Sequence, residues 1–432
     1  MNDGWRPERS IAPPERSASC RGHDAPVQSP SILFLAHRIP FPPDRGDKIR
    51  SWHLLKALGQ LARVHLACFA DDTADAAHLP ALREAMGDRL GEAHVEPRRT
   101  GRAAAGARAL LAGKPVSLTL FDSAALRAFV DRLLSRGDIG TVFAFSGQMA
   151  QFVPERLAQR FVMDLGDVDS AKFGQYAEEG SGPMRWVHRR EAQRLFAFER
   201  ATATRADITT FVSEAEASLF RAQTGIASIR ALSNGIDLAF FDAQADFPSL
   251  SENERGPGRI VLFTGQMDYA PNIDAVRWFT ADVLPLLPGI RFVIAGRNPT
   301  EAVRALAAAN VTVTGAVADM RSWLAAADVV TAPLRIARGI QNKVLEAMAM
   351  AKPVVATSAA FEGIEAEPGR DLLVADGAEG MADAIRRLLA APAGAAAMGW
   401  SARLRMERSY SWEQRLAPLE EMVFPADRKA AA

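Results

Sequence analysis

"RGIQNKVLEAMAMAKPVVAT", residues 338–357, combines a polar loop, an amphipathic helix and a short apolar strand. Val344, Leu345 and Met348 recur at helical spacing. The run "PVVAT" at 353–357 is continuously apolar, as expected of a strand that is buried on both faces. Strands of this kind belong to parallel sheets that helices cover on both sides, so the stretch predicts an α/β fold.

The same alternation of apolar strand and helical pattern runs through the rest of the chain. Strands are predicted at 31–36, 63–69, 141–145, 160–165 and 207–212, and then at 259–264, 291–296, 311–315, 328–333, 353–357 and 371–375. The segment 242–258 ("DAQADFPSLSENERGPG") is polar, contains proline and glycine and has no periodicity, so we interpret it as a linker. We therefore predict two Rossmann-like, doubly wound α/β domains, over 31–241 and 259–405, that face one another across a cleft.

The two ends of the chain depart from this pattern. Residues 1–30 are rich in arginine and proline and lack the apolar segment of a signal peptide, so a disordered tail is predicted. Residues 406–423 are helical in pattern, with Ser411 placed to cap a helix and Gln414 three residues later. No strand follows, so we expect this C-terminal helix to pack back on the N-terminal domain.

The bulk composition argues against several classes of protein. The formal charge balances at 51 basic against 51 acidic residues, which gives no support to a nucleic-acid partner. The two cysteines cannot form a disulfide framework, and metal-ligand spacing is absent. No apolar run approaches the length that a membrane span needs. We expect a cytoplasmic globular protein without a bound metal.

Ligands of open parallel sheets bind beyond the carboxyl ends of the strands, so the loops after the strands are the places to search. In the first half, a proline-rich loop ends at Gly46, where a helix is predicted to begin. Helix N–H groups, together with Lys48 and Arg50, favour an anion or a polar hydroxyl there. The alternative is an ordinary strand-to-helix connection in which Gly46 supplies a turn.

A second loop of the first half carries Asp164, Asp167 and Asp169 directly after a predicted strand. Three carboxylates in six residues suggest hydroxyl binding, a base or a metal. No histidine or cysteine joins them, so a transition metal is not expected. Asp167 or Asp169 could equally cap the next helix.

Two loops of the second half have the same strand, glycine and polar-loop arrangement. Gly265 and Gln266 follow one predicted strand, and Gly296 and Arg297 follow the next. A single glycine falls short of a dinucleotide-binding fingerprint, which disfavours an oxidoreductase. Arg297 is either a contact for a diphosphate or an exposed loop arginine.

The helix at the centre of 338–357 carries the strongest local signal. Asn342 is the expected N-cap, and Lys343 and Glu346 lie one turn apart. A lysine at a helix start is electrostatically disfavoured, and a bound phosphate would remove that conflict. The Glu346 carboxylate could accept two hydrogen bonds from ribose hydroxyls. The alternative is a surface Lys–Glu pair.

Taken together, these motifs resemble retaining glycosyltransferases of the GT-B fold, family 4. The resemblance covers residue 31 to about 423 and rests on "NGID", "DYAPNIDA", "ADVVTAPL" and "NKVLEAMAMAKPVVAT". The combination of "HRIPFPPDRGDKIRSWHLL", "MDLGDVDSAKF" and "RGIQNKVLEAMAM" is similar to a narrower group, the sugar transferases associated with PEP-CTERM and exosortase exopolysaccharide loci.

The resemblance implies that the C-terminal domain binds a nucleotide-sugar and that the N-terminal domain binds a glycan or lipid-linked acceptor. Glu346 would hold the ribose hydroxyls, Lys343 and nearby helix amides the donor, and Gly46 would lie against the donor phosphates. Asp164 would contact the transferred sugar or the acceptor. The residues expected in catalysis are Lys343, Glu346, Arg338 and Asp164, and those expected in donor binding are Gly46, Lys48, Gly265, Gln266, Arg297, Gly339, Asn342 and Val344.

The chain departs from the family's pattern at two positions. Arg338 stands where a second glutamate is common, and Gln266 follows Gly265 in a loop that has no lysine. Our hypothesis is that Arg297, Arg338 and Lys343 meet the phosphate charge instead, which would allow transfer without a metal. Retention of configuration is what the resemblance implies. Alternatives are a sugar-nucleotide epimerase of the same fold and a non-catalytic binding subunit with a degenerate donor site.

The segment 182–207 is arginine-rich and helical, and it also contains Trp186, Leu195 and Phe198. It is either a solvated helix face over a core stripe or a surface that contacts the inner face of the cytoplasmic membrane.

Overall fold

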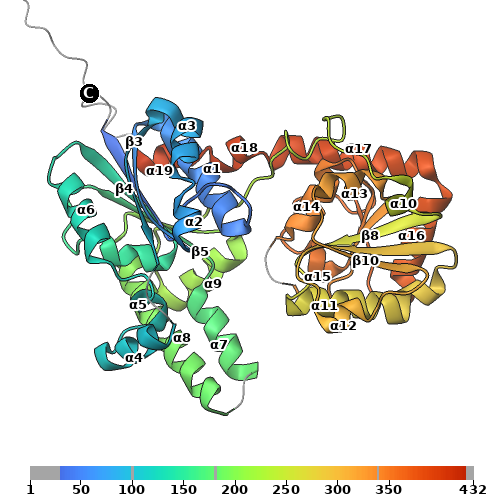
Figure 1. Cartoon of the computed structure of the whole chain (residues 1–432), viewed down its shortest axis with the longest axis horizontal. Coiled ribbons are helices and arrows are strands. Elements are labelled where there is room, and N and C mark those ends of the chain that lie inside the picture. The colour runs from blue at the N-terminus through green and yellow to red at the C-terminus, as the bar shows by residue number, and fades with distance from the viewer. Residues whose placement is uncertain (1–29, 99–101, 180–181, 338–339, 425–432) are drawn as a thin grey trace, which may run out of the picture.

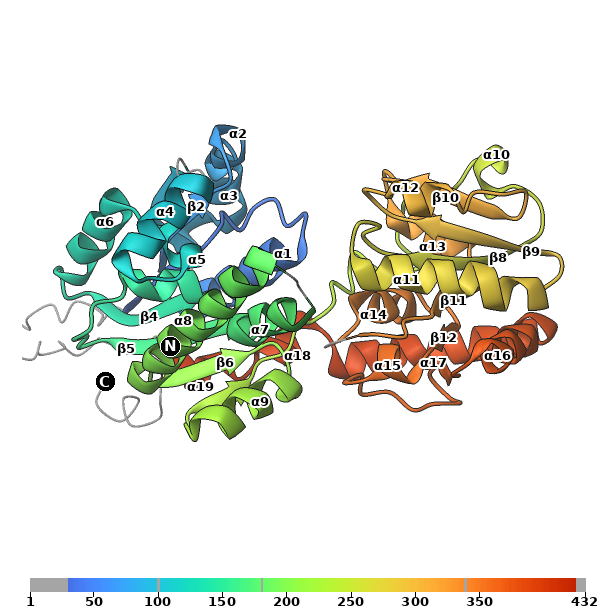
Figure 2. The same ribbon diagram turned by 90° about the horizontal axis from the view of Figure 1, so that it is seen from below.

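The computed structural model describes residues 30–98, 102–179, 182–337 and 340–424. The tail expected at residues 1–30 therefore falls almost wholly outside the described residues. Two lobes lie side by side, each built around one parallel sheet with helices on both faces (Figure 1; Figure 2).

The sheet of the N-terminal lobe has seven parallel strands in the order β3-β2-β1-β4-β5-β6-β7. Its strands are β1 (Ser31–Ala36), β2 (Val64–Ala70), β3 (Leu90–Pro97), β4 (Ile139–Phe145), β5 (Arg160–Gly166), β6 (Ile208–Phe211) and β7 (Ile229–Ala231). Successive residues of β1 enter different cores: Leu33 and Leu35 join one cluster, and Ile32 and Phe34 join the other. This double burial is why the strand reads as a continuous apolar run.

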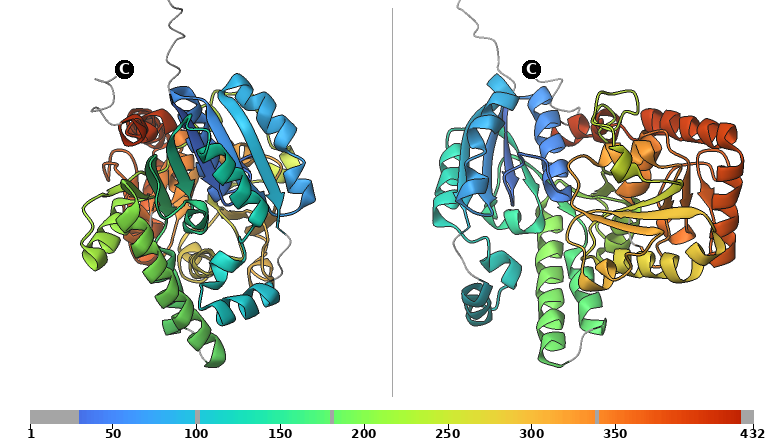
Figure 3. Two further views of the ribbon diagram at one scale, coloured as in Figure 1. Left: turned by 90° about the vertical axis from the view of Figure 1, so that its left-hand side faces the viewer. Right: turned by 45° about the vertical axis from the view of Figure 1, so that its right-hand side comes forward.

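The helices of this lobe cover both faces of the sheet. They are α1 (Gly46–Leu61), α2 (Thr73–Ala76), α3 (Leu79–Met86), α4 (Arg102–Ala112), α5 (Val116–Thr119), α6 (Ala124–Leu134), α7 (Asp169–Glu179), α8 (Gly182–Arg205) and α9 (Glu214–Thr224), with single turns η1 (Gly87–Arg89) and η2 (Gly147–Phe152). The α7–α8 hairpin projects beyond the body of the lobe, with α4 beside it (Figure 3).

The sheet of the C-terminal lobe has six strands in the order β10-β9-β8-β11-β12-β13. They are β8 (Arg259–Thr264), β9 (Ile290–Ala295), β10 (Val311–Gly315), β11 (Val329–Ala332), β12 (Val354–Ala356) and β13 (Leu373–Val374). Its helices are α10 (Glu252–Arg255), α11 (Ala270–Trp278), η3 (Phe279–Val283), η4 (Leu284–Leu286), α12 (Glu301–Arg304), α13 (Met320–Ala326), α14 (Asn342–Ala349), α15 (Ser358–Phe361), α16 (Ala378–Ala390) and α17 (Pro392–Ser409).

The chain crosses between the lobes twice, and the two crossings touch. The Ile236 N–H donates to the Tyr410 carbonyl at 2.7 Å, where the chain leaves and re-enters the N-terminal lobe. The helix expected over 406–423 is broken there: α17 ends at Ser409, and α18 (Trp412–Leu416) and α19 (Leu419–Val423) follow, with Ser411 capping α18. Thr141 Oγ1 donates to the Val423 carbonyl at 3.0 Å, so the end of the chain packs on the N-terminal sheet.

The two strands that the sequence did not predict, β3 and β7, are both edge strands. An edge strand is buried less completely, and β3 is mostly half-buried, so its polar residues interrupt the apolar signal. None of the helices in the described ranges is long and apolar enough to cross a bilayer.

Candidate active site

The helix α14 begins where the sheet of the C-terminal lobe ends, and its first turn presents Lys343. The helix starts at Asn342, with Gln341 as the N-cap, so the prediction of Asn342 as the cap was one residue late. Within the described chain, neither the Asn342 nor the Lys343 N–H has a backbone acceptor. Val344 and Leu345 are fully buried and anchor the helix to the core. The first turn of α14 therefore holds two N–H donors at a fixed place, without a backbone partner among the described residues.

Lys343 is held in place by neutral groups. Its Nζ donates to Asn272 Oδ1 and lies 4.6 Å from the centre of the Phe263 ring. The Asn272 amide is oriented by its own Nδ2, which donates to the Gln266 carbonyl at 2.9 Å. Burial lowers the pKa of Lys343 to about 8, although the nearby Glu346 charge opposes the shift. Among the described residues the ammonium has no carboxylate in contact, and an anionic ligand would supply a counter-charge.

Glu346 lies one turn further along the same side of α14 and is half-buried. Burial raises its pKa to about 7, and the Lys343 charge acts in the opposite direction. No group in the described part of the chain donates a hydrogen bond to its carboxylate. A half-buried carboxyl group without donors is suited to accept hydrogen bonds from ligand hydroxyls.

Two glycines bring the strand-end loops of β8 and β9 into contact beside Lys343. A Cβ on Gly296 would stand 1.7 Å from the Gly265 carbonyl oxygen, so only glycine permits this approach. A Cβ on Gly265 would stand 2.8 Å from Asn272 Nδ2 and 3.4 Å from Lys343 Nζ. The Gly265 N–H donates to the Ala295 carbonyl at 3.1 Å, so it is not open to a ligand. Gly265 contributes space next to the lysine rather than a donor.

Arg297 and Gln266 stand at the rim of the same loops. Arg297 is exposed, and its Nη2 lies 3.4 Å from Gln266 Oε1, a long and weak hydrogen bond. The guanidinium is therefore available to a ligand. Arg338 and Gly339 precede α14 in the sequence. Both lie outside the described residues, so the roles predicted for them stay predictions.

Val344 does not fit the role of a donor-binding residue. Its side chain is fully buried, and its N–H donates to the Gln341 carbonyl at 2.9 Å. Its apolar side chain packs in the core, so a donor-binding role for Val344 is not supported.

In the N-terminal lobe, Lys48 and Asp164 at the strand ends are already paired, whereas Asp167 and Asp169 after β5 have no ion pair with a described residue. Lys48 is buried, and its Nζ lies 2.6 Å from Asp75 Oδ1, so its charge is not open to a donor as expected. Gly46 begins α1, and a Cβ there would meet no atom within 4 Å. No protein group thus demands a glycine at this position.

Asp164 is completely buried and forms an ion pair with Arg50. The Arg50 Nε donates to Asp164 Oδ2 at 2.9 Å, and further nitrogens donate to Asn234 Oδ1 at 2.7 Å and to the Leu232 carbonyl at 2.8 Å. Asp164 therefore ties β5 to α1 and to the first crossing between the lobes. Its carboxylate has no access to a substrate, so direct contact with the sugar or the acceptor is not supported.

Sequence reasoning missed Asn272 as the partner of Lys343 and Arg50 as the partner of Asp164. Asn272 falls within the "DYAPNIDA" motif, which could have drawn attention to it, whereas Arg50 is separated from Asp164 by 114 residues. Within the described ranges, no three histidine, cysteine or carboxylate side chains are grouped as metal ligands.

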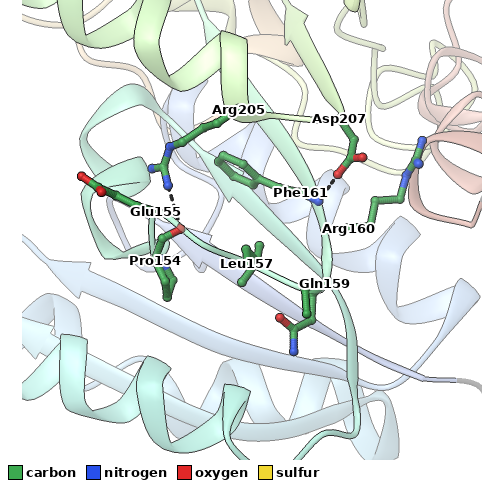
Figure 4. Close-up of a pocket in the computed structure, with 9 residues that line it drawn as sticks. Pro154, Glu155, Leu157, Gln159, Arg160, Phe161, Arg205 and Asp207 are labelled. Atoms are coloured by element: carbon green, nitrogen blue, oxygen red, sulfur yellow. Dashed lines mark hydrogen bonds between the residues drawn. The ribbon is translucent and has the colours of Figure 1, made fainter.

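The pocket shown in Figure 4 lies at the opposite edge of the N-terminal sheet, at the amino ends of β5 and β6. Its volume is about 290 Å³. The Arg205 guanidinium donates hydrogen bonds to the carbonyls of Val153 and Pro154, both at 2.9 Å. The Asp207 carboxylate accepts a hydrogen bond from the Phe161 N–H at 2.7 Å. Its polar groups serve the fold, and its position is not the ligand edge of a parallel sheet.

Residues 258–391 match the family described as glycosyl transferases group 1. No curated protein matches the chain. Among solved structures, sucrose-phosphate synthase from Thermosynechococcus elongatus aligns with a TM-score of 0.65 at 17% identity, over 93% of this chain and 100% of that one. HepE from Anabaena, in complex with UDP-glucose, aligns with a TM-score of 0.59 at 16% identity, over 93% and 100% of the two chains. WaaG, a glycosyltransferase involved in lipopolysaccharide biosynthesis, aligns with a TM-score of 0.61 at 17% identity, over 91% and 100%.

These likenesses confirm the predicted architecture of two Rossmann-like domains in the GT-B arrangement. The family match over the C-terminal lobe confirms the prediction of a glycosyltransferase. Lys343, Glu346, Gly265 and Gly296 all lie within the matched residues.

Proposed function

We propose that the enzyme transfers a sugar from a nucleotide-sugar donor to a glycan or lipid-linked acceptor, with retention of configuration and without a divalent metal. One observation supports this most directly. A lysine and a glutamate on one turn of α14 are half-buried and form no salt bridge with any described residue, and burial draws their pKa values to about 8 and about 7. A ligand with both anionic oxygens and hydroxyl groups complements the pair, and a nucleoside diphosphate has both. HepE was solved with such a donor, UDP-glucose.

The charge development of the reaction fits this arrangement. When the bond between the sugar carbon and the phosphate oxygen breaks, negative charge grows on the diphosphate and the sugar becomes oxocarbenium-like. Lys343, the first-turn N–H groups of α14 and Arg297 would stabilise that negative charge, since preorganised donors act strongly in a site with little water. Cations of the protein would thus fill the role that a divalent metal fills elsewhere.

For retention, the acceptor hydroxyl would attack from the same face that the diphosphate leaves. The new bond forms between the acceptor oxygen and the sugar carbon, and the hydroxyl proton passes to the departing phosphate oxygen. This route requires no nucleophile from the protein. It requires a cation that holds the leaving group in place, which is the role we propose for Lys343.

The motifs shared with sugar transferases of PEP-CTERM and exosortase loci support a place in exopolysaccharide biosynthesis. We propose that the enzyme meets a lipid-linked acceptor at the inner face of the cytoplasmic membrane.

A thermal-shift screen across UDP-, GDP-, ADP- and dTDP-sugars tests the proposed donor. A ligand at about 100 times its Kd stabilises the folded state by about 2.7 kcal/mol. For an enzyme of this size, the unfolding midpoint should therefore rise by several degrees with one nucleotide class. The variant Lys343→Met should lose the shift, whereas Arg387→Met, an exposed cation on α16, should keep it. The proposal fails if no nucleotide-sugar stabilises the wild-type protein.

A further inference from the structure

One end of the N-terminal lobe gathers exposed apolar side chains that no core requires. Leu110 and Leu111, in the last turn of α4, are 56% and 91% exposed, and Met184 and Trp186, in the first turns of α8, are 54% and 60% exposed. The inner face of α8 is satisfied by other residues, among them the buried Leu195. Leu110, Leu111 and Trp186 are therefore additional to the packing that holds the helices, whereas Met184 lies three helical turns before Leu195, on the inner face of α8.

Hydrogen bonds bring the two helix ends together. Arg190 of α8 donates to the Ala109 carbonyl at 3.1 Å and to the Lys114 carbonyl at 3.2 Å, so the last turn of α4 lies against α8. Trp186 precedes Arg190 by one helical turn and so lies on the same side of α8. Figure 3 shows α4 and the α7–α8 hairpin at the end of the lobe that projects from its body.

The exposed charged residues of α4 and of the first turns of α8 are basic, although Arg108 also lies 3.8 Å from Asp122 and the last turn of α7 carries the exposed Glu178. Exposed cations alternate with the apolar residues: Arg108, Lys114, Arg185, Arg189 and Arg194. Residues 102–114 contain no aspartate or glutamate, and residues 182–194 contain only Glu191. Glu191 is buried and accepts from the N–H groups of Val116 at 2.8 Å and Ser117 at 3.0 Å. In a chain whose total charge balances, this end is strongly basic.

We propose that this α4–α8 surface, formed by Leu110, Leu111 and Trp186 with the five exposed cations, docks on an anionic lipid bilayer. Aromatic and aliphatic side chains enter the headgroup region, and arginine and lysine attract anionic lipids. Tryptophan is preferred at that depth because its ring is apolar with one polar edge. A second copy of the chain is disfavoured as the occupant, because two identical basic surfaces repel each other.

The position of the α4–α8 surface in the fold indicates what docking would achieve, and in this respect the inference rests on the proposed function. Both α4 and α7 follow strands at their carboxyl ends, β3 and β5, so the projecting end starts at the ligand edge of the N-terminal sheet. Docking there would bring the acceptor side of the enzyme to a membrane that holds a lipid-linked acceptor.

Flotation with vesicles tests the proposal on the full chain. The wild-type protein should bind vesicles of phosphatidylcholine with phosphatidylglycerol, bind pure phosphatidylcholine vesicles at least about tenfold more weakly, and lose affinity as salt rises. The double variants Leu111→Ser/Trp186→Ser and Arg185→Glu/Arg189→Glu should each weaken binding about tenfold or more.

Matched controls come from the C-terminal lobe. Trp400→Ser removes another exposed tryptophan, and Arg387→Glu/Arg408→Glu reverses two other exposed arginines, so neither should alter vesicle binding. All variants should keep the thermal shift with the donor, which reports the proposed function separately. The proposal is overturned if wild-type protein ignores anionic vesicles at low salt, if the control variants lose binding equally, or if the surface variants instead abolish self-association seen by light scattering.

Discussion

In the N-terminal lobe, Arg50 and Asp164 meet in a buried ion pair, and Lys48 is paired with Asp75. In the C-terminal lobe, by contrast, Lys343 is held by an amide and an aromatic ring and has no ion pair with a described residue. Both sets lie at the carboxyl ends of parallel strands in sheets of the same winding. A strand-end charge that the fold neutralises is part of the structure, and one that the fold leaves without a counter-charge is prepared for a ligand. The sheet topology shows where charged residues of both kinds lie. The presence or absence of an ion pair then separates structural charges from those prepared for a ligand.

The largest expected effect comes from breaking the buried Arg50–Asp164 ion pair of the N-terminal lobe. Asp164→Ala leaves the Arg50 guanidinium buried without its carboxylate, which should lower the free energy of unfolding by about 3–5 kcal/mol. The matched control is Glu92→Ala, which removes an exposed pair with Arg132 and Arg136 and should cost no more than about 1 kcal/mol. Urea denaturation measures both. Equal losses in the two variants would contradict a structural role for the buried pair.

The second prediction concerns the unpaired side. Lys343→Met should reduce kcat by about 10²–10³-fold, because it removes a preorganised donor to the leaving group. It should not lower the unfolding free energy of the ligand-free protein, since an apolar side chain of similar length replaces a desolvated cation. Initial rates and urea denaturation together test this. If Lys343→Met were destabilised and kept its kcat, Lys343 would be a structural residue rather than one that binds the leaving group.

The third prediction sharpens the role of Glu346. Hydrogen bonds to a charged group are worth about 1.5–3 kcal/mol, so Glu346→Gln should lower kcat/KM for the donor by about 10–100-fold. If the carboxylate binds ribose hydroxyls, the wild-type enzyme should also discriminate against a donor that lacks the 2′-hydroxyl, and the variant should lose that discrimination. A variant that still discriminates would place the carboxylate elsewhere on the substrate.

The fourth prediction follows from the pKa of Lys343, which burial lowers to about 8. Above this pH the free enzyme loses the ammonium charge, so kcat/KM should fall with rising pH, by at most tenfold per unit, or about 1.4 kcal/mol. A bound phosphate favours the charged form, so kcat in the donor complex should decline only at higher pH. The pH profile of Lys343→Met should lack the decline near pH 8. A wild-type profile that is flat to pH 10 would show that the ammonium does not act in the free enzyme.

The fold was predictable because its signal is local. Strands buried on both faces, such as β1 and β8, read as apolar runs, and their predicted bounds agree with the structure. The edge strands β3 and β7 were missed, because partial burial leaves polar residues in their sequences. The break in the last helix at Tyr410 was also missed, since it depends on a contact with Ile236 far away in the chain.

The site was predictable only in part, for a related reason. Lys343 and Glu346 stand on one helix turn, so their spacing in the sequence is their spacing in space. The pairing of Asp164 with Arg50, and of Lys48 with Asp75, depends on residues 114 and 27 positions apart. A sequence shows that a charge follows a strand, but it does not show whether the fold has already neutralised that charge.

The smallest expected effect concerns Arg45, a partly exposed residue beside the paired charges of the N-terminal lobe. Arg45 is one third exposed, its Nε lies 2.9 Å from Asp47 Oδ1, and Asp47 is also held by His37 and Arg38. Because these partners remain and the pair is partly solvated, Arg45→Ala should lower the unfolding free energy by less than about 1 kcal/mol. The neighbouring cations nonetheless lie at the ligand edge of the N-terminal sheet, where an acceptor with a phosphate could reach them. If Arg45→Ala leaves stability intact but lowers kcat/KM for the acceptor tenfold, Arg45 belongs with Lys343 as a cation used by a substrate, and pairing alone would no longer separate structural charges from functional ones.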